Sequence, residues 1–235
     1  MEEGGDRNQN QLLGYLVAVV AVVLATVAVV AMIASIGGGS DGDADEPDPG
    51  GDVTVREVEE PDLLPGGGLF KIPEEVDGPE MGAAAADCEL RTFRARTRDH
   101  IGPNDPPVDY SSNPPTSGMH DPVPAPDGAY EESPDVENLV HTLEHSRVIV
   151  WFERDLPAKA RASLKAYYDN DKGLMVLVPD TTGMDYKVAA TAWTRKPGKH
   201  GTGRLLGCRE YSPDVFTAIE AFKQAYRGKG LELVP

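Results

Sequence analysis

The longest hydrophobic run of the chain lies near its N-terminus and contains no charged residue. It extends from Leu12 to Ile36, 25 residues dominated by Val, Ala and Leu. At about 1.5 Å per residue a helix of this length spans roughly 37 Å, which exceeds the hydrocarbon thickness of a bilayer. A signal peptide has a shorter apolar core and a basic leader, whereas Arg7 is the only basic residue here. The run predicts an uncleaved transmembrane helix over residues 12–36 in the lipid bilayer, after a cytoplasmic tail over residues 1–11.

Three later stretches space their apolar residues as on one face of a helix, at i, i+3, i+4 and i+7. Each follows a capping residue or a proline, the usual signals of a helix start, and they begin after Asp135, at Pro157 and after Asp214. We therefore expect three amphipathic helices that pack on a core. Their apolar stripes are Val136, Leu139, Val140 and Leu143 in the first, Ala160, Leu164, Tyr167 and Tyr168 in the second, and Val215, Ile219, Phe222 and Tyr226 in the third.

Short runs rich in β-branched and aromatic residues predict strands over Val148–Phe152, Leu174–Val178 and Lys187–Thr194. The last two are separated by Pro179–Gly183, a sequence that suits a hairpin or a longer turn. The fold class is therefore α+β. The simplest layering places about three helices on one face of a small sheet.

The net charge of −17 is concentrated before this region. Residues 41–80 contain fourteen acids and two bases, whereas residues 81–235 contain twenty-two acids and nineteen bases. An acidic, Gly- and Pro-rich segment repels itself and buries little apolar surface, so residues 37–80 are predicted to be a disordered linker. Residues 81–235 are long enough for one core and form the predicted domain. Because this domain is almost neutral, it has no basic footprint for nucleic acid.

Two cysteines, Cys88 and Cys208, lie near the two ends of the predicted domain. No Lys or Arg occurs between Ile36 and Val55, which favours an orientation with the C-terminal domain outside the cytoplasm. In that compartment two cysteines are expected to pair, and the bridge would close a loop of about 120 residues. The competing interpretation is a metal-binding or reactive thiol. The sequence thus predicts a single-pass protein of the cell membrane whose C-terminal domain lies outside the cytoplasm.

Three of the five histidines, His120, His141 and His145, lie within 26 residues of one another. His141 and His145 are four residues apart on the side of their predicted helix that faces away from the apolar stripe, a spacing at which two imidazoles can bind one ion. The structural alternative is a pair of solvated histidines on an exposed face.

The loop before this helix, the Pro-rich loop, contains five prolines and two glycines, which restrict it to extended segments and sharp turns. These residues are Pro114, Pro115, Pro122, Pro124, Pro126, Gly118 and Gly128. Lying across the polar side of the helix, the loop would bring His120 to His141 and His145 and leave a position for a fourth ligand. The alternative is that the loop only covers the core and His120 bonds to backbone. Candidate fourth ligands are His100, Met119, Asp121 and Glu144, of which Met119 suits copper and the two carboxylates suit zinc.

These residues also carry a resemblance to a known family. Asn113-Pro114-Pro115-Thr116-Ser117-Gly118, His120, Gly128, Tyr130 and Leu139–His145 resemble the signature of the bacterial domain of unknown function numbered 3105. The resemblance covers roughly residues 87–226. It implies a membrane anchor, a variable linker and a domain in which His120, His141 and His145 matter, and it implies no activity. This chain has Thr142 and Ser146 where the family more often has Asn and Gly.

The sequence His141-Thr142-Leu143-Glu144-His145 also matches H-x-x-E-H, an inverted zinc-peptidase motif in which Glu144 would activate water. Such an enzyme needs a third protein ligand on a later helix, for which Glu220 is the candidate. Our leading hypothesis is a membrane-tethered domain that is not an enzyme and binds copper or zinc as a carrier or accessory factor. The first alternative is a metal-free domain that docks onto an envelope protein through the Pro-rich loop, and the second is the hydrolase.

Overall fold

The computed structural model describes residue 64, residues 68–102 and residues 104–234. Within these residues, no helix is both long enough and apolar enough to cross a membrane. The predicted anchor over residues 12–36 and the cytoplasmic tail before it lie outside the described residues. Part of the predicted linker is described, and there Phe70 packs its ring edge-on against Tyr167, with 5.6 Å between centroids. Packing on the domain therefore begins before residue 81.

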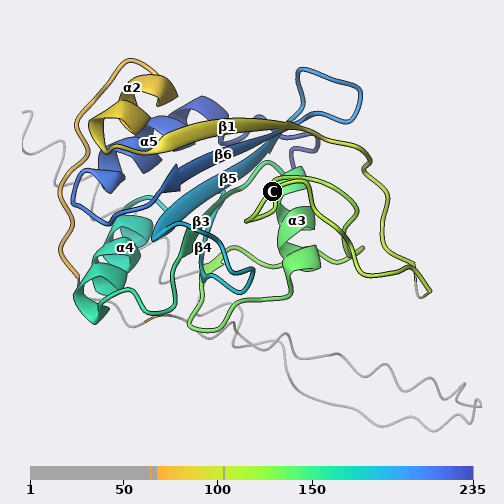
Figure 1. The fold of residues 1–235 in the computed structure, drawn as a ribbon, viewed down its shortest axis with the longest axis horizontal. Coiled ribbons are helices and arrows are strands. Elements are labelled where there is room, and N and C mark those ends of the chain that lie inside the picture. Colours follow the sequence, from red (N-terminus) through yellow and green to blue (C-terminus); the bar gives the residue numbers. More distant parts are fainter. Residues whose placement is uncertain (1–63, 65–67, 103, 235) are drawn as a thin grey trace, which may run out of the picture. The chain divides into compact units, whose positions relative to one another are not determined.

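A mixed six-stranded sheet forms the centre of the domain, in the order β1-β6-β5-β3-β4-β2 (Figure 1). The pairs β1–β6, β6–β5 and β5–β3 are antiparallel, whereas the pairs β3–β4 and β4–β2 are parallel. The strands are β1 (Glu89–Arg94), β2 (Gly128–Ala129), β3 (Val148–Phe152), β4 (Met175–Pro179), β5 (Val188–Thr194) and β6 (Thr202–Cys208).

Helices cover both faces of this sheet. The helices α2 (Pro79–Ala85), α4 (Ala158–Asn170) and α5 (Val215–Tyr226) contribute to one hydrophobic cluster with Val150 and Leu177 of the central strands. The helix α3 (Val136–Glu144) lies on the opposite face, where Leu139 and Leu143 pack with Ile149 and Trp151. Alternate residues of β3 thus enter different clusters because successive side chains of a strand point to opposite faces.

The α+β class is confirmed, but the predicted layering was wrong in two respects. The described residues contain four helices rather than about three, and α3 lies on the face opposite the others. Of the two connections predicted between β4 and β5, a hairpin or a longer turn, the hairpin does not form, because β3 lies between these strands and pairs with both. The helix predicted after Asp135 begins at Val136, and strand Val148–Phe152 has the predicted bounds.

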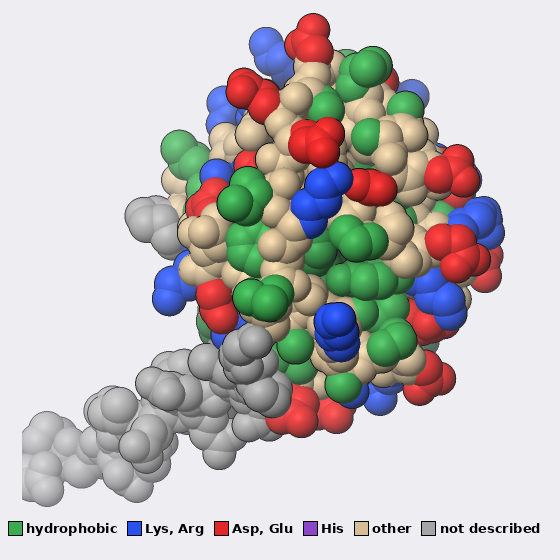
Figure 2. Space-filling view, turned by 90° about the vertical axis from the view of Figure 1, so that its left-hand side faces the viewer, with side chains coloured by type: hydrophobic (Ala, Val, Ile, Leu, Met, Phe, Trp, Pro, Cys, Tyr) green, Lys and Arg blue, Asp and Glu red, His purple; other side chains and the backbone are tan. Residues whose placement is uncertain are grey.

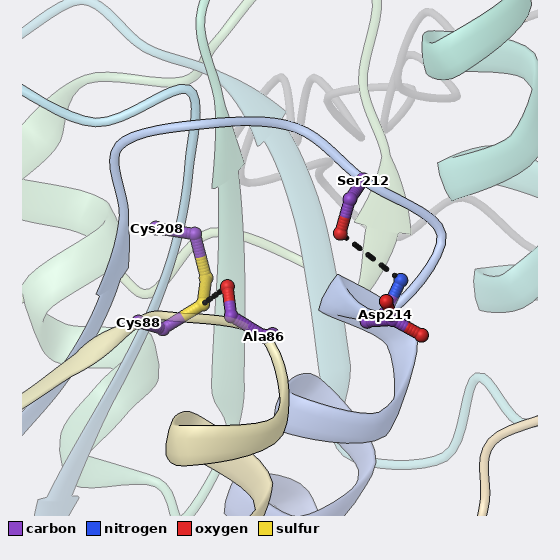
Figure 3. Close-up of a disulfide and its surroundings, with 5 residues drawn as sticks. All are labelled: Ala86, Cys88, Cys208, Ser212 and Asp214. Atoms are coloured by element: carbon purple, nitrogen blue, oxygen red, sulfur yellow. Dashed lines mark hydrogen bonds between the residues drawn. A yellow bond between two sulfur atoms is a disulfide. The ribbon is translucent and has the colours of Figure 1, made fainter.

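The predicted disulfide is confirmed, and it ties the start of the domain to the last strand. Cys88 and Cys208 are bonded, with 4.3 Å between their Cα atoms and 120 residues between them in sequence (Figure 3). Cys88 immediately precedes β1, and Cys208 ends its partner strand β6. Both cysteines of the chain are therefore used, which excludes the alternative of a reactive or metal-binding thiol in this state.

Figure 2 shows one side of the domain, on which acidic and basic side chains are interspersed around gathered hydrophobic ones. No histidine is visible on this side among the described residues. Three of the histidines, His120, His141 and His145, belong instead to the neighbourhood of α3 and the loop before it.

Candidate metal centre

The Pro-rich loop lies along the polar side of α3 and is held there by hydrogen bonds in both directions. The amide of Asp121 donates to the Glu137 carbonyl at 3.3 Å, and the Asn138 side chain donates to the Val123 carbonyl at 2.7 Å. Farther along, the hydroxyl of Thr142 donates to the Ala125 carbonyl at 2.8 Å. Because the loop is fixed to the helix at these points, the residues of both elements keep a defined relative position.

His120, in this loop, is fully buried, with 0% of its surface exposed. Its Nδ1 lies 2.8 Å from the Gly118 carbonyl oxygen. A carbonyl can only accept a hydrogen bond, so Nδ1 carries a proton, and a ring with this single proton has its lone pair on Nε2. Nε2 makes no hydrogen bond with any described residue, although it lies 3.1 Å from Oε2 of Glu144. The Nε2 of His120 therefore faces the Glu144 carboxylate without a hydrogen bond between the two groups.

His141, in α3, is oriented in the same way. It is buried, and its Nδ1 donates to the carbonyl oxygen of Asp121 at 2.6 Å, so its lone pair is also on Nε2. Burial lowers the pKa of His141, which the Asp121 carbonyl opposes and the neighbouring His120 reinforces. His141 is thus held as a neutral ring whose unprotonated Nε2, 3.0 Å from Nε2 of His145, has the lone pair that binds metals.

His100 joins these two histidines through backbone pairing between segments twenty residues apart. It forms an isolated parallel β-bridge with His120, in which the amide of Ile101 donates to the His120 carbonyl at 2.7 Å. The His100 ring lies 4.9 Å from the His120 ring and 5.1 Å from the His141 ring, measured between centroids. Since His100 is exposed, it connects the buried residues to solvent.

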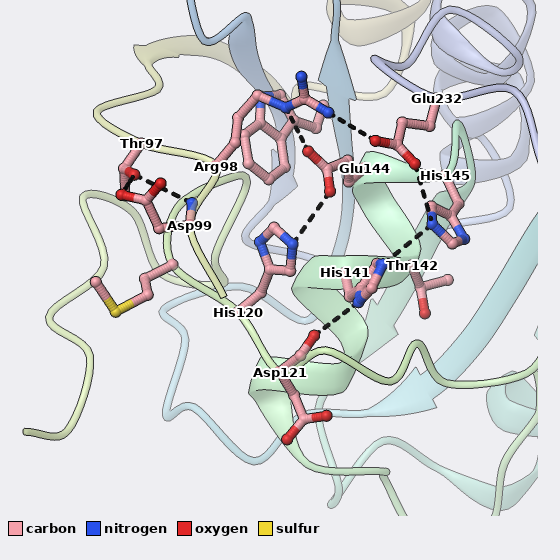
Figure 4. A network of polar contacts seen from close by, with 12 residues as sticks. Thr97, Arg98, Asp99, His120, Asp121, His141, Thr142, Glu144, His145 and Glu232 are labelled. Atoms are coloured by element: carbon pink, nitrogen blue, oxygen red, sulfur yellow. Dashed lines mark hydrogen bonds and ion pairs between the residues drawn. The ribbon is translucent and has the colours of Figure 1, made fainter. Parts of the chain in front are cut away.

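Glu144 completes the group from the last turn of α3. Its carboxylate is buried, and its Oε1 accepts a hydrogen bond from Nε of Arg98 at 2.5 Å (Figure 4). Burial alone would raise the pKa of Glu144, but His120, when its Nε2 carries a proton, and the bond from Arg98 outweigh burial and lower the pKa to about 2. The residue is therefore an anion at neutral pH.

Together, His100, His120, His141 and Glu144 form what we call the histidine cluster. One donor atom from each lies within 4.8 Å of every other, close enough to hold a metal ion. Four ligands bound about 2.0–2.2 Å from a tetrahedral zinc ion lie roughly 3.3 Å apart, so binding would draw these atoms inward by about an ångström. Two of the imidazoles already have their second nitrogen fixed by a carbonyl, the outer-shell arrangement common to histidine ligands of metals.

A family model described as a protein of unknown function, DUF3105, matches residues 102–230, more than half of the chain. The chain belongs to the DUF3105 family. The recognised resemblance is thereby confirmed, and the match includes His120, His141 and Glu144, whereas His100 lies two residues before it. No curated protein and no solved structure matches this chain.

In this DUF3105 protein, three further residues predicted as ligands lie at the edge of the cluster. The Nε2 of His145 is 3.0 Å from that of His141 and 3.7 Å from Oε2 of Glu232, but His145 does not share the four-donor group. The carboxylate of Asp121 accepts a hydrogen bond from the Val123 amide at 2.7 Å. The carbonyl of Met119 accepts one from the Tyr110 hydroxyl at 2.9 Å. A ligand role for these three residues stays a prediction.

The turn that follows His145 has a local conformation that explains a family feature. Ser146 has a φ of 71°, in the left-handed region that glycine adopts most easily. This is the position at which the resemblance described above implies Gly more often than Ser. In this chain the Ser146 side chain offsets part of the strain by donating a hydrogen bond to the Glu232 carbonyl at 2.7 Å.

The hydrolase hypothesis needs Glu220 as a third ligand, and this residue is engaged elsewhere. Glu220 lies on α5, on the other face of the sheet from α3, where its Oε2 accepts a hydrogen bond from Tyr167 at 2.6 Å and pairs with Lys223 at 2.6 Å. It therefore cannot join His141 and His145 around one ion. The H-x-x-E-H residues of this chain therefore lack the helix ligand that the hydrolase hypothesis named, and the hydrolase itself stays a prediction.

Proposed function

We propose that this DUF3105 protein binds a transition-metal ion through His100, His120, His141 and Glu144. The observation that carries the proposal is the fully buried Nε2 of His120, which has no hydrogen-bond partner among the described residues and points at an ionised carboxylate. A lone pair and an anion at 3.1 Å repel one another unless a cation lies between them or the ring takes up a second proton. A metal ion satisfies both groups at once.

The donor set narrows the choice of metal. Three imidazole nitrogens and one carboxylate oxygen suit Zn²⁺ and Cu²⁺, both of which accept mixed nitrogen and oxygen ligands. Cu⁺ prefers sulfur ligands, whereas the four donors of the proposed site are nitrogen and oxygen atoms. We therefore propose zinc or divalent copper as the bound ion.

The proposed role is that of a metal carrier or accessory factor in the cell envelope. The exposed His100 gives an ion a path to the buried ligands, which a carrier needs for loading and release. The disulfide supports a location outside the cytoplasm, since such bonds persist in oxidising compartments. With residues 12–36 as a membrane anchor, the domain would act close to the outer side of the bilayer.

The rival role, a metal-free domain that docks through the Pro-rich loop, has less support. Pro114, Pro115 and Ser117 at the start of that loop are buried within the domain, so only its later part, with the exposed Val123, could contact a partner. The buried, oriented imidazoles also have no use in such a role.

Metal analysis of the full-length protein tests the proposal directly. The chain is purified in detergent, stripped with a chelator, challenged separately with zinc and copper, and its bound metal is counted by elemental analysis after gel filtration. We expect one ion per chain for the wild type and a loss of that ion in His120→Ala and His141→Ala.

The matched control is His200→Ala, which removes a histidine from the turn between β5 and β6, away from the cluster. This variant should keep the full metal content. Equal metal content in all three variants, or a wild type that binds neither ion, contradicts the proposal and favours an imidazolium at His120 paired with Glu144.

A further inference from the structure

A second site lies where the end of β5 meets the segment that follows α5. The two segments are joined by a hydrogen bond from the Arg195 amide to the Lys229 carbonyl, at 2.9 Å, beside a pocket of about 420 Å³. Its lining is strongly basic, and no acidic residue contributes to it among those the structure describes. The basic side chains of the lining are Arg195, Lys196, Arg204 and Lys229, and Thr194 and Tyr226 lie beside them.

These four cations have no carboxylate partner among the residues that the structure describes. Nine other Lys and Arg side chains of the described part form ion pairs, but Arg195, Lys196, Arg204 and Lys229 form none. Residues 81–235 contain twenty-two acids and nineteen bases, so four cations gathered without a carboxylate are a local excess of positive charge. Like charges gathered around one concave surface raise the local concentration of anions.

Arg204 is already oriented for recognition. Its guanidinium lies over the ring of Tyr226, 5.2 Å from the centroid, and its Nε donates to the Thr194 hydroxyl at 3.2 Å. A guanidinium has five N–H donors, so most of them remain available after this bond. A planar donor fixed by stacking loses little entropy when it binds an oxyanion in a bidentate manner.

We propose that this pocket binds the phosphate group of an anionic ligand. A tetrahedral oxyanion of charge near −2 matches one fixed guanidinium surrounded by mobile ammonium groups, because the guanidinium sets the geometry and the lysines neutralise charge. The group is carried either by a soluble phosphorylated compound or by a phospholipid headgroup. The proposal is independent of metal binding, since no residue of the histidine cluster lines the pocket.

Calorimetric titration of the full-length protein in detergent, with inorganic pyrophosphate as the probe, tests the site. We expect saturable binding that weakens as salt is added, and a loss of affinity of about tenfold or more in the double variant Lys196→Ala/Lys229→Ala. Both lysines are exposed, so this variant should fold. The matched control is Lys199→Ala, in the same turn but outside the pocket, which should change the affinity less than about twofold.

The source of the phosphate is found by repeating the titration in nanodiscs. If the pocket accepts lipid headgroups, phosphatidylglycerol in the disc will compete and raise the apparent Kd for pyrophosphate relative to pure phosphatidylcholine. An unchanged Kd supports a soluble ligand. The proposal is overturned if pyrophosphate shows no saturable binding, or if the double variant binds it as tightly as Lys199→Ala does.

Discussion

Two groups of buried polar side chains lie on opposite faces of the sheet, and they differ in how completely their atoms are partnered. On the α5 face, Lys223 is only 2% exposed, yet its Nζ lies 2.6 Å from Glu220 and 3.1 Å from Asp171. Tyr167 donates to Glu220, and Arg227 donates to Asp171 at 2.9 Å. We call these five residues the lysine network. Its cations and anions satisfy one another.

The histidine cluster on the α3 face also contains buried ionisable side chains but is not closed in this way. Arg98 satisfies one oxygen of Glu144, while the other oxygen faces the unpartnered Nε2 of His120. Leaving a buried polar atom without a partner costs about 1–3 kcal/mol. Burial alone therefore does not identify a ligand site, because Lys223 of the lysine network is buried too. What distinguishes the histidine cluster is a buried set of donor atoms without a counter-charge among the described residues.

The largest effect on the free energy of unfolding is expected when Lys223, the buried cation of the lysine network, is replaced. Lys223→Met keeps the long apolar stem but removes the cation from Glu220 and Asp171, which should lower the free energy of unfolding by about 3 kcal/mol. Urea unfolding can be followed through the fluorescence of Trp151 and Trp193, both buried and the only tryptophans of the chain. Lys199→Met, in an exposed turn, is the matched control and should stay within about 0.5 kcal/mol of wild type.

Adding metal should close the open cluster and leave the lysine network unaffected. At 100 times its Kd, zinc or copper should raise the free energy of unfolding by about 2.7 kcal/mol. Because separate sites are additive to within about 0.5 kcal/mol, Lys223→Met should show the same increment from its lower baseline. His120→Ala should show none. An increment that persists in His120→Ala would place the ion elsewhere.

Acid should weaken the closed network by a smaller amount. The hydrogen bond from Arg227, aided by Lys223 against the opposing effect of burial, lowers the pKa of Asp171 to about 2 from an ordinary value of 3.8. A lowered pKa stabilises the fold above the unfolded value, so this contribution is present above about pH 4 and is lost as the pH falls toward 2. Because the carboxylate is partly exposed, the loss should be about 1 kcal/mol, and Asp171→Asn should remove this part of the pH dependence in urea titrations. A variant with an unchanged acid profile would contradict it.

Local patterns predicted the parts of the fold whose signals are local. The stripe Val136, Leu139, Val140 and Leu143 indicated α3, and the run Val148–Phe152 indicated β3, because periodicity and composition act within one element. The antiparallel strand β6 was missed. It contains Gly203 and Gly207, which weaken a strand signal, and they are required by neighbours: a Cβ at Gly203 would lie 2.1 Å from Thr116, and one at Gly207 2.3 Å from the Tyr186 ring. Which strands pair is set by such long-range packing.

The same division applies to the candidate site. The spacing of His141 and His145 on a helix and the prolines before it were sufficient to predict that His120 lies against α3, whereas Glu144 was only a candidate fourth ligand. His100 was only one of several candidate fourth ligands, because its position depends on a backbone bridge to His120 that no local pattern encodes. Which ring nitrogens carry protons could not be predicted from the sequence either. This follows from the carbonyls of Gly118 and Asp121, which approach the rings only in the folded chain.

The smallest effect is expected at the exposed rim of the histidine cluster, where Arg98 joins two acids. Its Nε donates to Glu144 and its Nη2 donates to Glu232 at 2.8 Å, but Glu232 is 45% exposed, whereas Glu144 is buried. Glu232→Gln should therefore change the free energy of unfolding by no more than about 0.5 kcal/mol and the metal affinity by less than about threefold. The same chemical change at the buried end, Glu144→Gln, removes a charged ligand and should lower the affinity at least about tenfold. Competition titrations with a chromophoric chelator compare the two variants, and equal affinities would mean that Arg98, rather than the ion, is the counter-charge that Glu144 requires.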